Sequence, residues 1–197
     1  MVKQLCIATR NAGKIQEFRF LLKDLPVEIH DLSEFPEIEA PEETGTTFQA
    51  NARLKARYYA AATKMPCVAD DSGLECWALD GRPGVLSARY SGAEATDKEN
   101  MDKLLADMKF CVRRNCRFRC ALSVVLPEGR VLNEVDGICE GMLLHAPLGE
   151  EGFGYDPIFW STELHMGFGE ASAEEKNSVS HRGKAIRKLV SLWKRHR

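Results

Sequence analysis

The chain has 197 residues, of which 44% are apolar and 28% charged, and its formal net charge is −2. This size and composition are typical of one globular domain with a sizeable core. The near-neutral charge argues against non-specific binding of nucleic acid. No apolar run approaches the roughly 20 residues that cross a bilayer, and the first residues lack the layout of a signal peptide. We therefore expect a cytoplasmic protein with neither a membrane nor a nucleic acid as partner.

The cysteines are seven in number and scattered along the chain. An odd number in a chain of this size favours reduced thiols in a reducing compartment. Cys111, Cys116 and Cys120 form the one cluster, with no C-x-x-C pair and no nearby histidine, which disfavours a zinc site. Cys120 lies in an apolar run and is expected to pack as a small hydrophobic residue.

The first half of the chain predicts a strand, a helix and a second strand, followed by a loop and a longer helix. Residues 4–9 read as the first strand and 27–30 as the second. Residues 32–45, rich in Glu and Pro, predict the loop, and 47–63 the longer helix. The helix between the two strands has its apolar residues on one face: Ile15, Phe18, Leu22 and Leu25.

Two adjacent carboxylates, Asp70 and Asp71, follow the apolar run 66–69, which predicts a short buried strand. Like charges repel, and burial disfavours the ionised form of each. A cation between or beside them removes both costs, which points to a divalent metal or an activated water. Ser72 and Gly73 then predict a tight turn near a ligand, and a plain solvated Asp-Ser-Gly turn is the alternative.

The next segment predicts short strands at 75–78 and 87–90 around the turn 80–84. Thr96 and Glu99 have the spacing of a capping box and open a helix that ends near Lys109.

The last third predicts a hairpin and a final helix. Strands at 117–126 and 130–140 flank the turn Pro127-Glu128-Gly129, and 153–160 reads as an aromatic strand or loop. Ser180 caps the final helix, whose apolar face carries Ile186, Leu189, Val190 and Trp193. This mixture of strands and helices predicts an α/β protein with a mixed sheet.

The first strand and helix are joined by a loop suited to an anion. A helix start offers unpaired backbone N–H groups and a positive dipole end. A glycine allows close approach and a lysine adds charge, although the loop lacks the glycine spacing of a Walker A motif. An ordinary connection is the alternative. The loop consists of Thr9, Arg10, Asn11, Ala12, Gly13 and Lys14.

Three further groups of residues could carry chemistry. Glu43 precedes a helix on which Asn51 and Lys55 share a face. The glycines of Gly152-Phe153-Gly154-Tyr155-Asp156-Pro157 suit a loop that presents a ring to a planar ligand. The third group is Lys176, His181 and Arg182, of which the last two are cations at a helix start, where the dipole disfavours them. Each group also has a simpler explanation. Glu43 could only stabilise the helix start, the Gly152 segment could be a core aromatic strand, and the third group could be a solvated surface.

Together, and in this order, these motifs resemble the Ham1 family, the inosine/xanthosine triphosphate pyrophosphatases, in its bacterial form. The resemblance spans nearly the whole chain. The matching motifs are Thr9-x-Asn11-x-x-Lys14, Glu43-Thr44-Gly45-x-Thr47-Phe48-x-x-Asn51-Ala52-x-x-Lys55, Ala69-Asp70-Asp71-Ser72-Gly73-Leu74, Pro83-Gly84-Val85-x-Ser87-Ala88-Arg89-Tyr90, Gly152-Phe153-Gly154-Tyr155-Asp156-Pro157 and Ser180-His181-Arg182-Gly183-x-Ala185.

The resemblance implies a single α/β domain over residues 1–197, with an elongated mixed sheet, flanking helices and two lobes around a central substrate cleft. It also implies a homodimer and a Mg2+-dependent hydrolase. Such an enzyme converts non-standard purine triphosphates (ITP, dITP and XTP) to the monophosphate and pyrophosphate, which keeps them out of DNA and RNA.

The resemblance also implies site residues. Thr9 to Lys14 and Lys55 would hold the triphosphate. Glu43 and Asp71 would bind the metal, with Asp71 also the general base and Asp70 in support. The residues that would contact the nucleotide elsewhere are Ser72, Phe153 (stacking on the base), Gly154, Tyr155, and the base-reading Asp156, Lys176, His181 and Arg182.

The residue chemistry agrees with this reading. Mg2+ and lysines lower the cost of attack on a polyanion, and donors such as His181 and Arg182 would pair with a C6 oxygen but not with the amino group of adenine. Glu150 and Glu151, before the Gly152 loop, depart from the family pattern. The alternatives are a Maf-like pyrophosphatase for other modified nucleotides and a module that binds a nucleotide without hydrolysing it.

Overall fold

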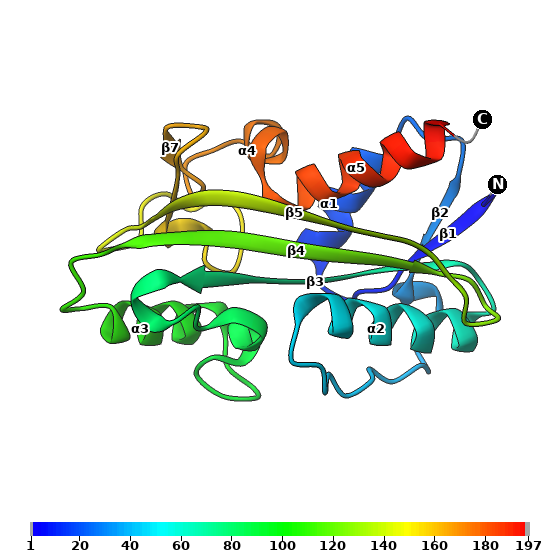
Figure 1. Cartoon of the computed structure of the whole chain (residues 1–197), viewed down its shortest axis with the longest axis horizontal. Coiled ribbons are helices and arrows are strands. Elements are labelled where there is room, and N and C mark those ends of the chain that lie inside the picture. Colours follow the sequence, from blue (N-terminus) through cyan, green and yellow to red (C-terminus); the bar gives the residue numbers. More distant parts are fainter. Residues whose placement is uncertain (1, 196–197) are drawn as a thin grey trace. The chain divides into compact units, whose positions relative to one another are not determined.

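The computed structural model describes residues 2–195 and contains one seven-stranded sheet, ordered β2-β1-β3-β4-β5-β6-β7 (Figure 1). β1 (Gln4–Ile7) pairs in parallel with both β2 (Glu28–Asp31) and β3 (Cys67–Cys76). β6 (Phe159–Ser161) is antiparallel to β5 (Val131–Leu143) and to β7 (Met166–Gly167). The predicted α/β class with a mixed sheet is confirmed.

The chain divides into two compact units. The first unit contains the described residues of 1–71, 120–136 and 182–197, and the second contains 72–119 and 137–181. The division falls within β3, between Asp71 and Ser72, so the two carboxylates of the sequence pair belong to the first unit.

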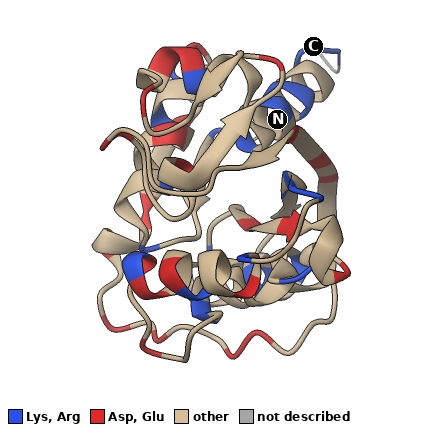
Figure 2. Ribbon diagram, turned by 90° about the vertical axis from the view of Figure 1, so that its left-hand side faces the viewer, with Lys and Arg blue, Asp and Glu red and all other residues tan. Residues whose placement is uncertain are grey.

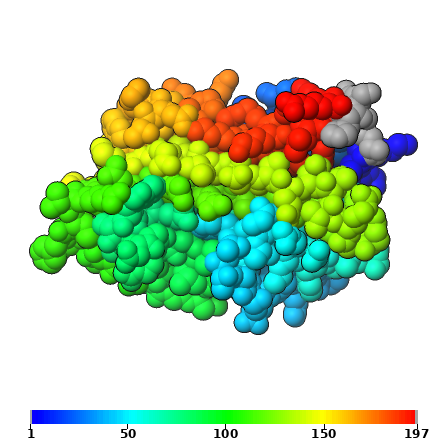
Figure 3. Space-filling view, in the orientation of Figure 1, coloured from blue at the N-terminus to red at the C-terminus, as the bar shows by residue number. Residues whose placement is uncertain are grey.

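In the first unit, helices cover both faces of the strands (Figure 1). α1 (Ala12–Leu22) and α5 (His181–Arg195) lie on one face, and α2 (Phe48–Thr63) lies on the other. In the space-filling view, the red surface of α5 and the cyan surface of α2 lie on either side of the yellow-green end of the hairpin formed by β4 (Asn115–Val125) and β5 (Figure 3).

Alternation along the strands separates the core of this unit into two clusters. Val68 packs with Leu5, Ile7 and residues of α1 and α5, whereas Ala69 packs with Cys6, Ala8 and residues of α2. Because side chains alternate along a strand, Asp70 follows Val68 onto the α1/α5 face and Asp71 follows Ala69 onto the α2 face. This register decides the geometry of the candidate site.

The second unit packs an aromatic core against the remaining parts of β3, β4 and β5. Its core includes Leu104 of α3 (Asp97–Asp107), Phe118 of β4 and Phe168. The other elements are η2 (Trp77–Leu79), η3 (Gly84–Arg89), η4 (Asp156–Ile158), β6, β7 and α4 (Ala173–Val179). The Thr96–Glu99 capping box predicted from the sequence is present at the start of α3.

Two local predictions were wrong. β3 does not end before Asp70; it runs through Asp70-Asp71-Ser72-Gly73 to Cys76. The turn preference of these residues is overridden because the two buried carboxylates find partners on opposite faces of the sheet. The strands expected at 75–78 and 87–90 are instead the end of β3 followed by the 3-10 helices η2 and η3.

Other predictions were correct, with one omission. The helix over 47–63 is α2, with Thr47 as its N-cap, and the hairpin of β4 and β5 is present. The sequence reading missed α4, although Ser172 and Glu175 form a capping box at its start.

All seven cysteines are thiols, and six of them are buried; Cys120 packs in the core as expected. Among the described residues, no helix combines the length and apolar character needed to cross a membrane. Lys and Arg are interspersed with Asp and Glu along the described helices and loops (Figure 2), so charges of both signs lie side by side.

Candidate active site

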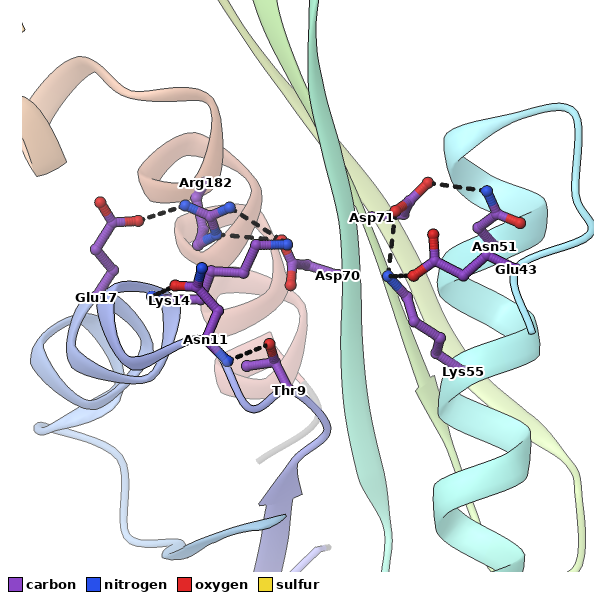
Figure 4. Close-up of polar contacts among 10 residues, drawn as sticks. All are labelled: Thr9, Asn11, Lys14, Glu17, Glu43, Asn51, Lys55, Asp70, Asp71 and Arg182. Atoms are coloured by element: carbon purple, nitrogen blue, oxygen red, sulfur yellow. Dashed lines mark hydrogen bonds and ion pairs between the residues drawn. The ribbon is translucent and has the colours of Figure 1, made fainter. Parts of the chain in front are cut away.

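The loop between β1 and α1 is shaped by its own polar side chains (Figure 4). Asn11 is the N-cap of α1, and its Oδ1 accepts a hydrogen bond from the Lys14 amide at 2.9 Å. Thr9 Oγ1 accepts one from the Asn11 amide at 3.2 Å. The first turn of α1 contains no acidic residue, so the helix start keeps the positive character that suits an anion.

Arg10 is placed differently from the rest of this loop. Its guanidinium donates hydrogen bonds to three backbone carbonyls, of Leu32 at 3.3 Å, Phe35 at 3.1 Å and Ile38 at 2.7 Å. These contacts fix the start of the segment that leads to Glu43. The structure therefore uses Arg10 to hold a neighbouring loop.

Asp70 lies on the α1/α5 face of β3 and contacts two cations (Figure 4). Its Oδ2 lies 3.0 Å from Lys14 Nζ and 3.0 Å from Arg182 Nη2, and Arg182 Nε is 3.3 Å away. Arg182 Nη1 in turn donates to Glu17 Oε2 at 2.5 Å. The two carboxylates raise the pKa of Arg182, although burial opposes them, so the guanidinium stays charged.

Asp71 lies on the α2 face and contacts residues of that helix and of the loop before it. Lys55 Nζ lies 3.1 Å from Asp71 Oδ1 and 2.8 Å from Glu43 Oε1. Asn51 Nδ2 donates to Asp71 Oδ2 at 3.2 Å, while Asn51 Oδ1 accepts from the Gly45 amide at 2.7 Å. Asn51 therefore connects Asp71 to the loop that carries Glu43.

The electrostatics of the α2 face favour the charged form of Lys55 and disfavour the ionised form of Asp71. Burial raises the pKa of the Asp71 carboxyl and nearby Glu43 adds to this, against the opposing effects of Lys55 and Lys14. Burial lowers the pKa of Lys55, but the carboxylates of Asp71, Asp70 and Glu43 together raise it by more, so the net shift is upward. A second cation beside Asp71 would relieve the crowding of its negative charge with that of Glu43.

The sequence predicts a cation between or beside the two aspartates, and the structure supports a place beside each one, with none between them. Asp70 and Asp71 point to opposite faces of β3 (Figure 4), and each has its own lysine, Lys14 for Asp70 and Lys55 for Asp71. Alternation along a continuous strand is the physical reason.

In the second unit, Phe153, Asp156 and Lys176 form a compact group. Asp156 Oδ2 accepts from the Phe153 amide at 2.8 Å and from Lys176 Nζ at 2.6 Å. Lys176 Nζ also lies 4.4 Å from the centroid of the Phe153 ring. These contacts hold the aromatic ring and the loop around it in one arrangement.

The neighbouring residues of this unit are also held. Tyr155 is buried and its hydroxyl donates to the Ser87 carbonyl at 2.8 Å. The Gly154 amide donates to Asp97 Oδ2 at 2.8 Å, and its φ of +62° is one that glycine adopts readily. The His181 ring stacks on Phe118 with centroids 4.7 Å apart. Ser72, the first residue of this unit in β3, is partly exposed.

Comparison with known proteins decides the family. The sequence model of the Ham1 family matches residues 5–192. The chain belongs to the Ham1 family. It is 46% identical over 191 residues to the dITP/XTP pyrophosphatase of Bacillus anthracis, with 95% of each chain covered. It is 46% identical over 194 residues to the protein of the same name from Geobacillus kaustophilus, covering 98% of this chain and 95% of that one.

Solved Ham1 structures share the fold. A HAM1 protein from Coxiella burnetii superposes with a TM-score of 0.88 at 37% identity, over 99% of this chain and 100% of that one. A nucleoside-triphosphatase / dITP/XTP pyrophosphatase from Mycobacterium abscessus superposes with a TM-score of 0.74 at 41% identity, over 94% and 97% of the two chains.

The carboxylates of this Ham1 chain fit a magnesium ion. Glu43 and Asp71 approach the same ammonium, that of Lys55, so their oxygens lie close enough to face one cation. Carboxylate oxygens are the ligands that Mg2+ prefers, and it usually keeps several waters and substrate phosphates beside one or two of them. Among residues 2–195, no group of three or more His, Cys, Asp or Glu side chains is placed to hold a metal ion.

Three residues of this Ham1 chain escaped the sequence analysis as site residues. Asn51 was noted only for sharing a helix face with Lys55; its burial at 0% exposure beside Asp71 shows its part in the site. Glu17 and Phe118 gave no sequence signal, because their partners Arg182 and His181 lie far along the chain.

Proposed function

We propose that this Ham1 protein hydrolyses dITP, XTP and ITP to the nucleoside monophosphate and pyrophosphate. The observation that carries the proposal is the Lys55 ammonium held between the Glu43 and Asp71 carboxylates. This arrangement combines a cation for phosphate with carboxylates for metal and water. Relatives 46% identical to this chain are named dITP/XTP pyrophosphatases, which favours this reading over a Maf-like enzyme.

The phosphates bind at the first unit. The start of α1, capped by Asn11 and shaped by Thr9, supplies the backbone N–H groups of residues 12 and 13, because the Lys14 amide is taken by the cap. Lys14 and Lys55 supply positive charge that offsets the roughly four negative charges of a triphosphate. Arg10 contributes indirectly, because its three contacts with backbone carbonyls fix the segment that leads to Glu43.

Glu43 and Asp71 would hold Mg2+, the cofactor that we assign to this reaction. Bound there, the metal would offset phosphate charge and favour attack on phosphorus. Asp71 accepts the proton of the attacking water, whose oxygen forms the new bond to the α-phosphorus as the bond to the leaving pyrophosphate breaks. Asn51 orients the Asp71 carboxylate by donating a hydrogen bond from its Nδ2 to Asp71 Oδ2. The presence of Asp71 together with its partners Lys55 and Asn51 argues against a module that binds a nucleotide without hydrolysing it.

The base is selected by residues of the second unit. Phe153 stacks on the purine. Asp156 and Lys176 hold the Phe153 ring in place and also read the edge of the base. His181, held against Phe118, donates toward the C6 oxygen of inosine or xanthine. Adenine presents an amino group there and leaves such a donor unpaired, which discriminates strongly. The loop residues Gly154 and Tyr155, together with Ser72, complete the contacts to the nucleotide.

The enzyme acts as a cytoplasmic homodimer.

The test measures pyrophosphate release by purified protein from dITP, XTP, ITP, GTP and dATP with Mg2+. We expect release from the first three at rates at least about a hundredfold above that for dATP, because a site that pairs with a substrate group rejects an analogue that lacks it. GTP carries the same C6 oxygen, so its rate shows whether the site also excludes the 2-amino group of guanine. Absence of pyrophosphate from all five would refute the hydrolase. Equal rates with dATP would refute the base-reading role of His181. Omission of Mg2+ with a chelator present is expected to abolish turnover.

A further inference from the structure

We propose that Asp97 is a positioning residue for the loop that binds the base. From the start of α3, its carboxylate holds the Gly154 amide, and this contact sets where the Phe153 ring meets the purine. The inference deepens the proposed function and rests on it, because the contact between this loop and the base belongs to that proposal.

The loop needs an anchor because it lacks regular structure. Residues 144–155 form neither helix nor strand. Gly152 and Gly154 have φ values of +79° and +62°. Glycine enters this region at no steric cost, but it also has many other conformations open to it. Phe153 lies between the two glycines, so contacts beyond the local backbone have to select one arrangement of its ring.

Two carboxylates accept the consecutive amides of Phe153 and Gly154. Asp156 Oδ2 accepts from the Phe153 amide at 2.8 Å. Asp97 Oδ2 accepts from the Gly154 amide, also at 2.8 Å. Hydrogen bonds to an ionised acceptor are roughly twice as strong as those between neutral groups. The two peptide groups that flank the Phe153 side chain are therefore both fixed.

The two carboxylates fix different things. Asp156 lies three residues from Phe153, and a Cβ added at Gly152 would lie 2.2 Å from its Oδ2, so it shapes the loop from within. Asp97 lies 57 residues from Gly154, on α3. A contact of this second kind relates the loop to the rest of the unit, and Asp97 makes it at the residue next to the ring.

Asp97 is itself firmly placed. It is the first residue of α3, where the helix dipole favours a negative side chain. The preceding residue, Thr96, forms the capping box with Glu99. Asn100 is buried and binds the backbone of residues 88–91 through both ends of its side-chain amide. The start of α3 is therefore a fixed support from which a carboxylate can hold a loop.

Stabilisation of the helix start is the simpler explanation for Asp97. The dipole favours a carboxylate there in any orientation, and solvent is available because Asp97 is exposed. Its Oδ2 instead accepts an amide of a distant loop. Because this contact lies at the surface, its loss should leave the fold intact and change the order of the loop first.

The experiment compares two variants of Asp97 with a control on the same helix. Asp97→Ala removes the acceptor, whereas Asp97→Asn keeps an acceptor oxygen and removes the charge. The matched control is Asp102→Ala, which makes the same change of charge at an exposed residue paired with Lys98 of α3. Full-length proteins are assayed for kcat and KM with dITP. Binding of dITP and of pyrophosphate, which has no base, is measured without Mg2+, and thermal unfolding is recorded for each protein.

We expect Asp97→Ala to raise KM and Kd for dITP about tenfold, because affinity falls with the fraction of molecules whose loop is in place. Its kcat should stay within about threefold of wild type, as when ground-state and transition-state binding fall equally. The Kd for pyrophosphate should not change. Asp97→Asn should recover most of the lost affinity, and Asp102→Ala should match wild type in every quantity.

Four results with the variants would overturn the inference. An unchanged Kd for dITP in folded Asp97→Ala would show that the contact does not position the loop. An equal rise in Kd for pyrophosphate would place the effect at the phosphates. Failure of Asp97→Ala to fold would make the contact purely structural. Equal losses in Asp102→Ala, or no recovery in Asp97→Asn, would remove the hydrogen bond as the cause.

The wild type separates this inference from the proposed function. A wild type that binds dITP but releases no pyrophosphate with Mg2+ would refute the proposed function alone, and the Kd for dITP in the variants would still decide the role of Asp97. A wild type that does not bind dITP would overturn both.

Discussion

The two faces of β3 in the first unit treat neighbouring aspartates in opposite ways. On the α1/α5 face, Asp70 and Glu17 are matched by Lys14 and Arg182, so the charges cancel. On the α2 face, Asp71 and Glu43 share Lys55, which leaves one negative charge in excess. The balanced face is suited to holding a lysine in place, and the unbalanced face is suited to attracting a metal ion.

The largest effect is expected for Asp71→Asn. The amide cannot accept the proton of water and is a poorer metal ligand, so turnover should fall by about a thousandfold or more. Burial raises the pKa of Asp71, which means that its ionised form costs stability at neutral pH. The neutral amide removes that cost. Melting temperature should therefore be unchanged or higher; turnover within tenfold of wild type would contradict the assignment.

Asp70→Asn is the matched variant on the other face, and it should act on stability first. Removing one partner of a buried ion pair leaves the remaining charges uncompensated, at a cost of about 3–5 kcal/mol. Urea unfolding of the two variants side by side measures this. A smaller loss of unfolding free energy for Asp70→Asn than for Asp71→Asn would reverse the comparison between the faces.

Gly45→Ala disturbs the α2 face without changing any charge. An added Cβ would lie 2.4 Å from Asn51 Oδ1 and 2.9 Å from Ala50 Cβ. Relief of this overlap displaces either the loop or Asn51, the residue that orients Asp71. We expect a loss of about 1–3 kcal/mol in stability, with a fall in kcat that Mg2+ titration does not restore. Unchanged kcat would show that the bond from Gly45 to Asn51 does not position Asp71.

The smallest effect is expected at Asp31, which lies on neither face of β3. Hydrogen bonds from Ser33, helped by Arg19, lower the pKa of Asp31 from 3.8 to about 2. A lowered pKa stabilises the fold above the ordinary value, and this contribution is lost as pH falls from about 4 to 2.

Asp31→Asn should therefore cost about 1–2 kcal/mol at neutral pH, given partial screening by solvent. The difference from wild type should shrink below pH 4 and vanish near pH 2, measured by urea unfolding across this range. A difference that is independent of pH would refute the ionic contribution.

Local patterns in the sequence predicted much of this fold. The loop after β1, the helix over 47–63 and the hairpin of β4 and β5 each follow from turn residues and periodicity within a short segment. The residues 70–73 misled the prediction because their turn preference is local, whereas their burial in β3 depends on partners from α1, α2 and α5.

The arrangement of the site could be predicted only in part. Spacing placed Asn51 and Lys55 on one helix face, but gave no sign that both contact Asp71. Glu17 and Arg182 are 165 residues apart, and no local pattern reports a contact of that range. The capping box of Ser172 and Glu175, by contrast, was legible in the sequence and predicts α4.

The cysteines offer an internal reporter of motion. Cys6 and Cys67 are register partners on β1 and β3, both 0% exposed, and a hydrogen bond between them together with burial raises the pKa of Cys6. Thiol reagents must reach the sulfur to attack it, and both sulfurs are buried, so these two positions should react only when the strands separate. Cys111 alone among the seven is partly exposed. Blocking it first would turn alkylation of the remaining thiols into a measure of how often the centre of the sheet opens.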